Sequence, residues 1–260
     1  MPDVTANEIS ISYEDTGGEG PILIFNHGLL MDRGMFAPQI ECLRRTHRCI
    51  SWDQRGFGKT GPVDRPFTYW TSAEDVLSLM SALNIQKAAL VGLSQGGFLS
   101  MRAALLAPKR ISGLVLLATR SGIDDRQTID NFRALSAEWK NNGSANVQGM
   151  LEKVLLGPDV DPEPWVTNWR SMGRDDMSYP LDALIGRDDI TANIANLACP
   201  SIVIHGTADI AIDIEHGRQL ARDLPTCKDC LEIEGAGHAV NLARADQVTN
   251  AIGVFLANLS

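Results

Sequence analysis

A serine between glycines is the residue whose surroundings most clearly indicate chemical reactivity. Residues 92–96 read Gly-Leu-Ser-Gln-Gly, between an apolar run at 88–91 and a helical pattern at 95–106. A serine at such a strand-to-helix turn exposes its hydroxyl at the sheet edge, and the glycines leave room for the tight backbone. The start of the helix offers unpaired N–H groups to negative charge. We therefore predict that Ser94 is a nucleophile.

A serine hydroxyl needs a base to take its proton, and His238 is the candidate among the five histidines. It ends the segment 234–238, Glu-Gly-Ala-Gly-His, between a strand pattern at 231–233 and the last helical pattern. This loop would open at the same sheet edge as Ser94. The other histidines precede a glycine at a strand end or lie in helix or loop segments: His27, His205, His47 and His216. The alternative for His238 is a structural loop residue.

The third member of such a site orients the imidazole and stabilises its charged form. Asp209 follows a predicted strand at 202–204 and would lie at the same edge, while Asp213 is a nearby rival. The turn after the preceding strand, residues 118–122, contains no carboxylate before Asp124. We therefore predict a triad in the chain order serine, aspartate, histidine, with Asp209 as the acid.

Acyl transfer to a serine also needs two N–H donors directed at the oxyanion of the tetrahedral intermediate. The backbone N–H of Gln95, the residue after the nucleophile, would be the first donor. The second would come from the loop at 27–32, which follows a predicted strand at 22–25. We choose Leu29 for this donor, with Leu30 as the alternative, because the sequence does not resolve an offset of one residue.

Short apolar runs alternate with helical patterns along most of the chain. The runs are typical of strands buried on both faces of a parallel sheet: 22–25, 49–52, 88–91, 114–117, 202–204 and 231–233. The helical patterns lie at 35–45, 73–83, 95–106, 214–224 and 246–259. This alternation predicts an α/β fold with a mostly parallel sheet and helices on both faces. Residues 8–13 alternate polar and apolar, which predicts an antiparallel hairpin at the sheet edge.

One interval, residues 123–198, contains no strand pattern and holds three of the five tryptophans. Helix-like segments lie around 128–140, 146–156 and 165–172. We interpret the interval as a helical cap inserted into a core made of residues 1–122 and 199–260. The alternative is a surface excursion with a small core of its own. Arg187 in this interval could meet a substrate carboxylate or form a surface salt bridge.

The composition and charge of the chain limit the kinds of partner that it is expected to bind. The net charge of −9 and the pI near 5.0 argue against nucleic acid, because phosphate binding needs clustered Lys and Arg. An odd number of cysteines, five, favours free thiols, and we interpret Cys227 and Cys230 as two thiols rather than a metal site. The N-terminus lacks the features of a signal peptide, and the apolar runs are too short to span a membrane. We expect a cytoplasmic protein without a metal, and the oligomeric state stays open.

Four motifs in this order resemble the α/β-hydrolase fold family. They are His27-Gly28, the segment 53–58 (Asp-Gln-Arg-Gly-Phe-Gly), the turn around Ser94, and the pair Asp209 and His238. The resemblance implies that residues 53–58 form a structural turn. It is strongest to the carboxylesterase, enol-lactonase and haloperoxidase-like groups. A serine in place of an aspartate nucleophile argues against the family's epoxide hydrolases and haloalkane dehalogenases.

These observations together predict a cofactor-free serine hydrolase that cleaves a carboxylic ester or lactone through an acyl-enzyme on Ser94. A small-molecule substrate is expected, but the sequence fixes neither its acyl nor its alcohol group. The same scaffold leaves open a carbon–carbon bond hydrolase, a cofactor-independent dioxygenase or a non-catalytic ligand-binding protein. Peracid formation from peroxide and a carboxylic acid is a further side reaction of this arrangement.

Overall fold

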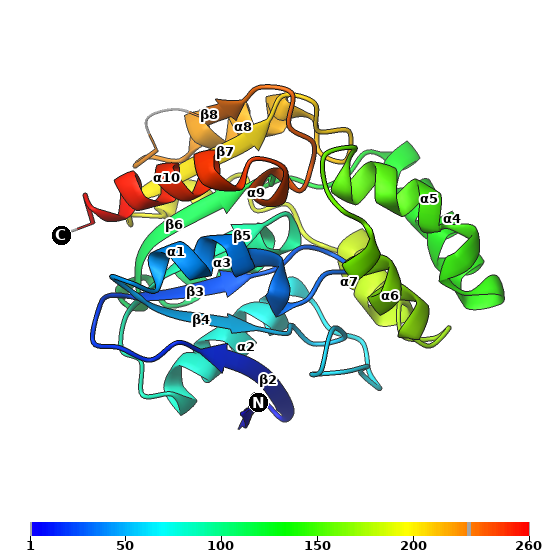
Figure 1. Cartoon of the computed structure of the whole chain (residues 1–260), viewed down its shortest axis with the longest axis horizontal. Coiled ribbons are helices and arrows are strands. Elements are labelled where there is room, and N and C mark those ends of the chain that lie inside the picture. The colour runs from blue at the N-terminus through cyan, green and yellow to red at the C-terminus, as the bar shows by residue number, and fades with distance from the viewer. Residues whose placement is uncertain (1, 228–229, 260) are drawn as a thin grey trace.

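An eight-stranded sheet with helices on both faces forms the body of the protein (Figure 1). The computed structural model describes residues 2–227 and 230–259. Across the sheet the strands follow the order β1-β2-β4-β3-β5-β6-β7-β8. Their bounds are β1 Asp3–Ala6, β2 Ile9–Asp15, β3 Ile22–Asn26, β4 Arg48–Trp52, β5 Ala88–Leu93, β6 Ile111–Leu117, β7 Ser201–Gly206 and β8 Cys230–Ile233.

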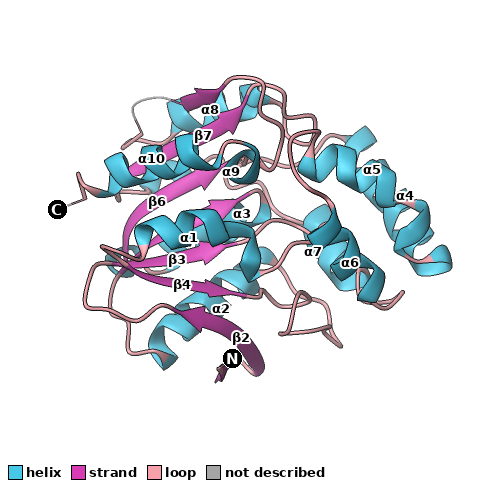
Figure 2. Cartoon of the chain, in the orientation of Figure 1, coloured by secondary structure: helices cyan, strands magenta, loops and turns pink. Residues whose placement is uncertain are grey.

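The predicted mostly parallel α/β arrangement is confirmed. Strands β3 to β8 pair in parallel, whereas β1 pairs with β2 and β2 with β4 in antiparallel fashion, as the alternating pattern near the N-terminus predicts. Every residue of β5 is buried, which matches its continuous apolar sequence. Because the parallel strands run in one direction, their carboxyl ends share one edge of the sheet (Figure 2). The residues predicted to take part in catalysis follow strands at this edge.

Helices cover both faces of the sheet (Figure 1). On one face α1 (Ala37–Leu43) packs against α10 (Ala245–Leu256), and on the other α2 (Tyr69–Ala82) packs against α3 (Gln95–Leu106). Helix α8 (Ile214–Asp223) packs on β7, and short helices η1 (Arg33–Phe36), η2 (Pro108–Arg110) and α9 (Val240–Ala243) lie in connections. The helical pattern at 35–45 begins as the 3₁₀ helix η1, capped by Asp32, before α1 takes over.

A series of helices connects β6 to β7 and lies beyond the carboxyl ends of the strands (Figure 1). We call residues 126–196 the helical insertion. Its elements are α4 (Arg126–Asn142), η3 (Ser144–Asn146), α5 (Gln148–Leu151), the π-helical turn η4 (Glu152–Leu156), α6 (Glu163–Ser171), α7 (Ser178–Ile185) and η5 (Ile194–Asn196). The sequence did not predict α7. Its proline, Pro180, lies in the first helical turn, where the missing N–H has no helical partner to lose.

Among the described residues, no helix is both long and apolar enough to cross a membrane.

Candidate active site

Ser94 lies on a strained turn between β5 and α3. Its backbone has φ 54° and ψ −116°, a conformation that costs a residue other than glycine about 1–3 kcal/mol. Hydrogen bonds hold this turn, since Ser94 N donates to Leu117 O over 2.9 Å. Its carbonyl accepts from Gly97 N at 2.9 Å and from the Thr119 hydroxyl at 2.8 Å. The neighbouring strand and the helix therefore impose the geometry that exposes the serine.

The glycines around Ser94 are required by close backbone contacts. A Cβ atom at Gly92 would collide with the carbonyl oxygen of Gly96, and one at Gly96 would collide with the carbonyl oxygen of Asn26. Neither neighbour is the flexible end of a side chain, so a larger residue would force the turn to open. This is the physical reason for the Gly-x-Ser-x-Gly spacing in this chain.

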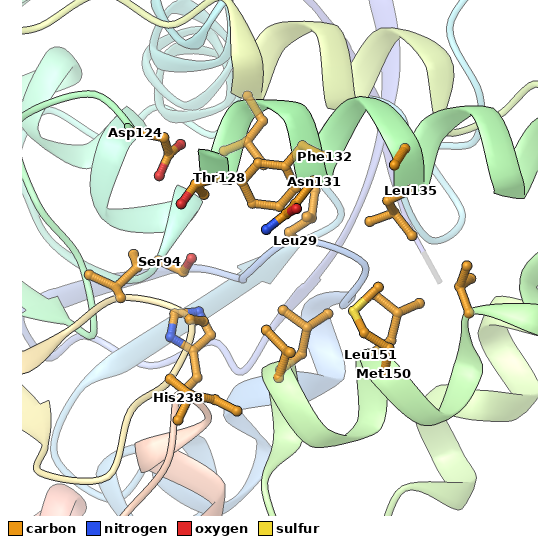
Figure 3. Close-up of a pocket in the computed structure, with 18 of the residues that line it drawn as sticks. Leu29, Ser94, Asp124, Thr128, Asn131, Phe132, Leu135, Met150, Leu151 and His238 are labelled. Atoms are coloured by element: carbon orange, nitrogen blue, oxygen red, sulfur yellow. The ribbon is translucent and has the colours of Figure 1, made fainter. Parts of the chain in front are cut away.

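The structure brings His238 and Asp209 together. His238 Nδ1 lies 2.8 Å from Asp209 Oδ2, and both side chains are buried. Because an ionised carboxylate only accepts, Nδ1 carries the hydrogen and Nε2 is left to take a proton. His238 and Ser94 line the same cavity, and Figure 3 shows the imidazole beside the serine side chain. The predicted serine, histidine and aspartate therefore meet at one place.

Asp209 is held in its ionised form by several donors. Its Oδ1 accepts from Ala211 N at 2.8 Å and from Ile212 N at 3.0 Å, while Oδ2 faces two histidines. Burial by itself would raise the pKa of Asp209. The electrostatic attraction to His238 and the hydrogen bonds from His205, His238 and Ile212 outweigh burial and hold that pKa well below its usual range. The carboxylate can thus orient His238 and stabilise its charged form.

The two other carboxylates that the sequence placed near this edge have different roles. Asp213 is exposed and accepts from Glu215 N at 2.9 Å, so it caps the N-terminus of α8. Asp124 is buried and forms ion pairs with Arg120 and Arg187. Of these three carboxylates, Asp209 is the one hydrogen-bonded to His238.

His205 is a contact of this site that the sequence reasoning missed. Its ring is fully buried, with Nε2 2.8 Å from Ile212 O and 3.2 Å from Asp209 Oδ2. Both neighbours are acceptors, so Nε2 carries a hydrogen and bridges the carboxylate to the loop that presents it. The sequence signal was weak, since His205 precedes a glycine at a strand end just as His27 does.

The turn at residues 53–58 supports the loop that follows β3. His27 is buried, and its Nε2 accepts from Gln54 N at 3.0 Å while Nδ1 donates to Gly28 O over 2.8 Å. Gln54 also donates from its side chain to His27 O over 2.6 Å. Within the turn, the buried Asp53 accepts from Lys59 N at 2.8 Å and from Arg33 N at 2.8 Å. His27 is thus a fixed part of the loop, with both ring nitrogens occupied.

The two predicted oxyanion donors, Gln95 and Leu29, lie in the segments that follow β5 and β3. Gln95 is the first residue of α3, so its N–H has no partner inside the helix. Leu29 lines the cavity together with Ser94, whereas Leu30 lies outside the lining and has a positive φ of 61°. This placement favours Leu29 over Leu30. The oxyanion role of Leu29 and Gln95 stays a prediction.

A cavity of about 550 Å³ opens above Ser94 and His238. Apolar side chains from the helical insertion form most of its far wall: Phe132 and Leu135 from α4, Met150 and Leu151 from α5, and Val154 and Leu155 from η4. Figure 3 shows Met150 and Leu151 facing α4 across this space. Met150 and Ile210, which also line it, are 45% and 60% exposed. The cavity therefore offers an apolar compartment with an apolar rim.

Charged side chains line the same cavity beside Ser94. Arg120, Asp124 and Arg187 are all buried and belong to its wall. Arg187 therefore does not form the surface salt bridge that was one of the two expectations for it. The free-energy cost of burying the Arg187 charge is offset because its guanidinium pairs with Asp124 and donates to Leu184 O over 3.0 Å.

Two further features bear on cofactors. The described part of the chain contains no group of three or more His, Cys, Asp or Glu side chains placed to hold a metal ion. Cys227 and Cys230 are not joined in a disulfide. The polar side chains that line the cavity are those of Ser94, His238, Arg120, Asp124 and Arg187, and of Thr128, Asn131 and Glu138 from α4.

Comparison with known proteins identifies the family. The family model of the alpha/beta hydrolase fold matches residues 21–245. The chain belongs to the α/β-hydrolase fold family. Among solved members, an esterase from Thermogutta terrifontis with malate bound is 27% identical, with a TM-score of 0.91 over 100% of this chain and 99% of that chain. The enol-lactonase from Burkholderia xenovorans LB400 is 25% identical, with a TM-score of 0.89 over 99% and 100%.

A relative identified by sequence is also a hydrolase by name. The human serine hydrolase BPHL is 27% identical over 97% of this chain and 85% of its own length. The resemblance to the α/β-hydrolase family and the predicted fold class are therefore confirmed. These three proteins are named as an esterase, an enol-lactonase and a serine hydrolase, so the reaction of this α/β hydrolase is argued from its own site.

Proposed function

We propose that this α/β hydrolase is a cofactor-free serine hydrolase of carboxylic esters or lactones. The observation that carries the proposal is the His238–Asp209 hydrogen bond of 2.8 Å beside a strained Ser94, with Ser94 and His238 in one largely apolar cavity. A buried base whose second nitrogen is fixed by a carboxylate is the arrangement that activates a serine hydroxyl.

The reaction follows from these positions. Ser94 Oγ attacks the substrate carbonyl carbon while His238 Nε2 takes the hydroxyl proton. The tetrahedral intermediate then expels the alcohol oxygen, which receives that proton from His238. A water molecule attacks the resulting acyl-enzyme with the same base, and carboxylic acid and free serine are released. In a lactone the expelled oxygen stays part of the product.

The oxyanion of each intermediate is assigned to two backbone donors, Leu29 N–H and Gln95 N–H. Each such donor contributes about 3 kcal/mol to the stability of the transition state in comparable sites. Leu29 is held by the loop that His27 and Gln54 fix, and Gln95 by the start of α3. These donors need no rearrangement when charge develops.

We assign the helical insertion, and with it residues 123–198, the role of a cap. Its apolar side chains face Ser94 across the cavity and would enclose the hydrophobic part of a substrate (Figure 3). Excluding water strengthens the electrostatic interactions at the reacting carbonyl. The names of an esterase and an enol-lactonase among similar structures support an ester or lactone as the substrate.

Hydrolysis of p-nitrophenyl esters with acyl chains of about two to twelve carbons tests the proposal. Wild type should be active with an optimum chain length set by the cavity, and Ser94→Ala should lose at least about 10⁴-fold in kcat. Ser72→Ala, a buried serine on α2 away from the cavity, is the matched control and should keep wild-type activity. Absence of activity at every length, from folded wild-type protein, would refute a simple esterase.

A further inference from the structure

Two buried arginines stand next to the nucleophile. Arg120 is adjacent in sequence to Thr119, whose hydroxyl donates to Ser94 O over 2.8 Å. The Arg187 guanidinium lies over the Phe98 ring, 4.6 Å from its centroid, and Phe98 N donates to Ser94 O over 3.2 Å. Arg120 is 8% and Arg187 7% exposed, and both line the cavity. Two cationic groups are therefore fixed at the reactive end of the cavity.

These arginines share one buried carboxylate. Asp124 forms ion pairs with both guanidinium groups. The remaining partners of Arg187 are neutral carbonyls, Leu184 O at 3.0 Å and Gly122 O at 3.3 Å. Arg120 reaches His216 Nε2 at 3.1 Å. Two guanidinium groups against one carboxylate leave one positive charge in the wall of the cavity, which is costly to bury.

Other carboxylates near this place attract the two arginines but are not paired with them. Asp125 and Asp189 are exposed to solvent, so water screens their attraction. Asp209 attracts Arg120 from a distance, but its hydrogen bonds are with the two histidines and the backbone of its own loop, and it forms no ion pair with either guanidinium group. Glu138 also lines the cavity, but from the far part of α4, where it accepts from Asn142 and Asn146 side chains.

One donor of Arg120 is left without a hydrogen-bond partner. Its Nε–H is buried and donates to no described neighbour within hydrogen-bonding distance, although almost all buried donors in proteins have an acceptor. Burial lowers the pKa of Arg120 and of Arg187 to about 10, which leaves both cationic at neutral pH. An additional anion at this place would supply both the missing charge and further acceptors.

We propose that the substrate of this hydrolase carries a carboxylate, which binds to Arg120 and Arg187 while the scissile carbonyl lies at Ser94. The inference rests on the proposed ester or lactone hydrolysis and names its substrate class, an anionic ester or lactone. Guanidinium groups suit this role because they bind a carboxylate with paired, charge-assisted hydrogen bonds. The apolar wall from α4 and α5 receives the uncharged part of the same molecule.

Matched ester pairs test this substrate class. The anionic series consists of monoethyl esters of dicarboxylic acids with about three to six carbons, and the neutral series of ethyl esters of monocarboxylic acids of equal length. We expect kcat/KM of wild type to be at least about tenfold higher for the best anionic ester than for its neutral match. Arg187→Gln and Arg120→Gln should each bring this ratio to about one, chiefly by lowering kcat/KM for the anionic ester.

Arg55→Gln is the matched control for the loss of a buried arginine. Arg55 pairs with the buried Asp75, as Arg187 does with Asp124, but it does not line the cavity. It should keep the wild-type ratio. A preference for anionic esters that persists in folded Arg187→Gln and Arg120→Gln protein overturns the proposal. Where these two variants fail to fold, a binding measurement on Ser94→Ala protein decides instead.

In that measurement, calorimetry compares binding of the monoethyl esters with binding of their neutral matches. Tighter binding of the anionic esters supports the carboxylate subsite even where an arginine variant fails to fold. Equal or weaker binding, or a wild type that prefers the neutral ester at every length, overturns it. Ser94-dependent hydrolysis of neutral esters in that case leaves the proposed function intact. Absence of all hydrolysis refutes the proposed function, and the binding comparison then decides the subsite alone.

Discussion

The two walls of the cavity differ in how firmly their residues are fixed. On the sheet side, α3 buries every residue from Gln95 to Ala104, and Ser94, Asp209 and His238 each lie in a hydrogen-bonded turn. On the opposite side, α4 spans 17 residues yet buries only Leu135 and Trp139. A reacting carbonyl needs positions held within fractions of an ångström, whereas an apolar wall needs only the right volume. We therefore assign the chemistry to the more buried sheet side and the substrate selectivity to the less buried insertion side.

A substitution on the sheet side that keeps the shape of the side chain and changes only its charge should have the largest effect on kcat. Asp209→Asn preserves the shape of the acid, but an amide can present a donor to His238 and favour the wrong tautomer. We expect kcat to fall by about 10³–10⁴-fold with a small change in KM, as measured on the best p-nitrophenyl ester. Asp213→Asn is the matched control, because asparagine caps a helix as well as aspartate. Equal losses in both variants would contradict the assignment of Asp209.

The same substitution has a consequence for stability against acid. The pKa of Asp209 is lowered in the folded protein, so its ionised form stabilises the fold fully above the unfolded pKa of about 3.9. That contribution is lost as the pH falls through the lowered folded pKa. Urea unfolding at pH 7 and below pH 4 should therefore show a smaller loss of stability on acidification for Asp209→Asn than for wild type. A larger loss in the variant would show that Asp209 is not stabilised as an anion.

The insertion side should change selectivity while the chemistry persists. Met150 is 45% exposed and lines the cavity, so a larger side chain there takes up space without disturbing the core. Met150→Trp should lower kcat/KM for the longest accepted acyl chain by about tenfold and leave acetate turnover within about twofold. Lys153→Trp adds the same ring at an exposed residue that does not line the cavity, and should leave the chain-length profile unchanged. A uniform loss across all chain lengths in Met150→Trp would argue that this wall also positions the carbonyl.

A hydrogen bond between the insertion and the oxyanion loop is the contact whose loss should have the smallest effect on kcat. Trp169 of α6 is fully buried and donates from Nε1 to Leu30 O over 2.7 Å, next to the predicted oxyanion donor Leu29. Trp169→Phe should lower the free energy of unfolding by about 1–2 kcal/mol and kcat by less than about tenfold. Trp139→Phe loses a similar bond, to Gly173 O, inside the insertion, and should lower stability with kcat unchanged. If both variants lose kcat equally, the link to the oxyanion loop is not specific.

The sequence predicted the sheet side better than the insertion side, and the reason is physical. Tight turns leave signs in sequence, because the contacts around Gly92 and Gly96 admit only glycine and the strands feeding these turns are continuously apolar. Ser94, Asp209 and His238 could therefore be placed from motif and chain order. The structure places all three at one cavity or behind it, and their catalytic roles remain the proposal to be tested.

What the sequence left open depended on loop conformation and on contacts that a local sequence pattern does not show. His205 contacts Asp209 only because the loop after β7 folds back over it, and the spacing carries no sign of this. Arg187 meets Asp124, 63 positions away in the chain, through the folding of the whole insertion. A local pattern could not tell this buried pair from a surface salt bridge. The choice between Leu29 and Leu30 likewise depended on the positive φ of Leu30.

The central claim is that Ser94 becomes covalently bonded to the acyl group. Inactivation with diisopropyl fluorophosphate, followed by intact mass measurement and peptide mapping, tests it most directly, since a phosphoryl group on an activated serine is stable. We predict one adduct per chain, located on Ser94, formed in parallel with the loss of esterase activity and absent from Ser94→Ala. An adduct on another residue that accounts for the lost activity, or wild-type hydrolysis by Ser94→Ala, would contradict the account.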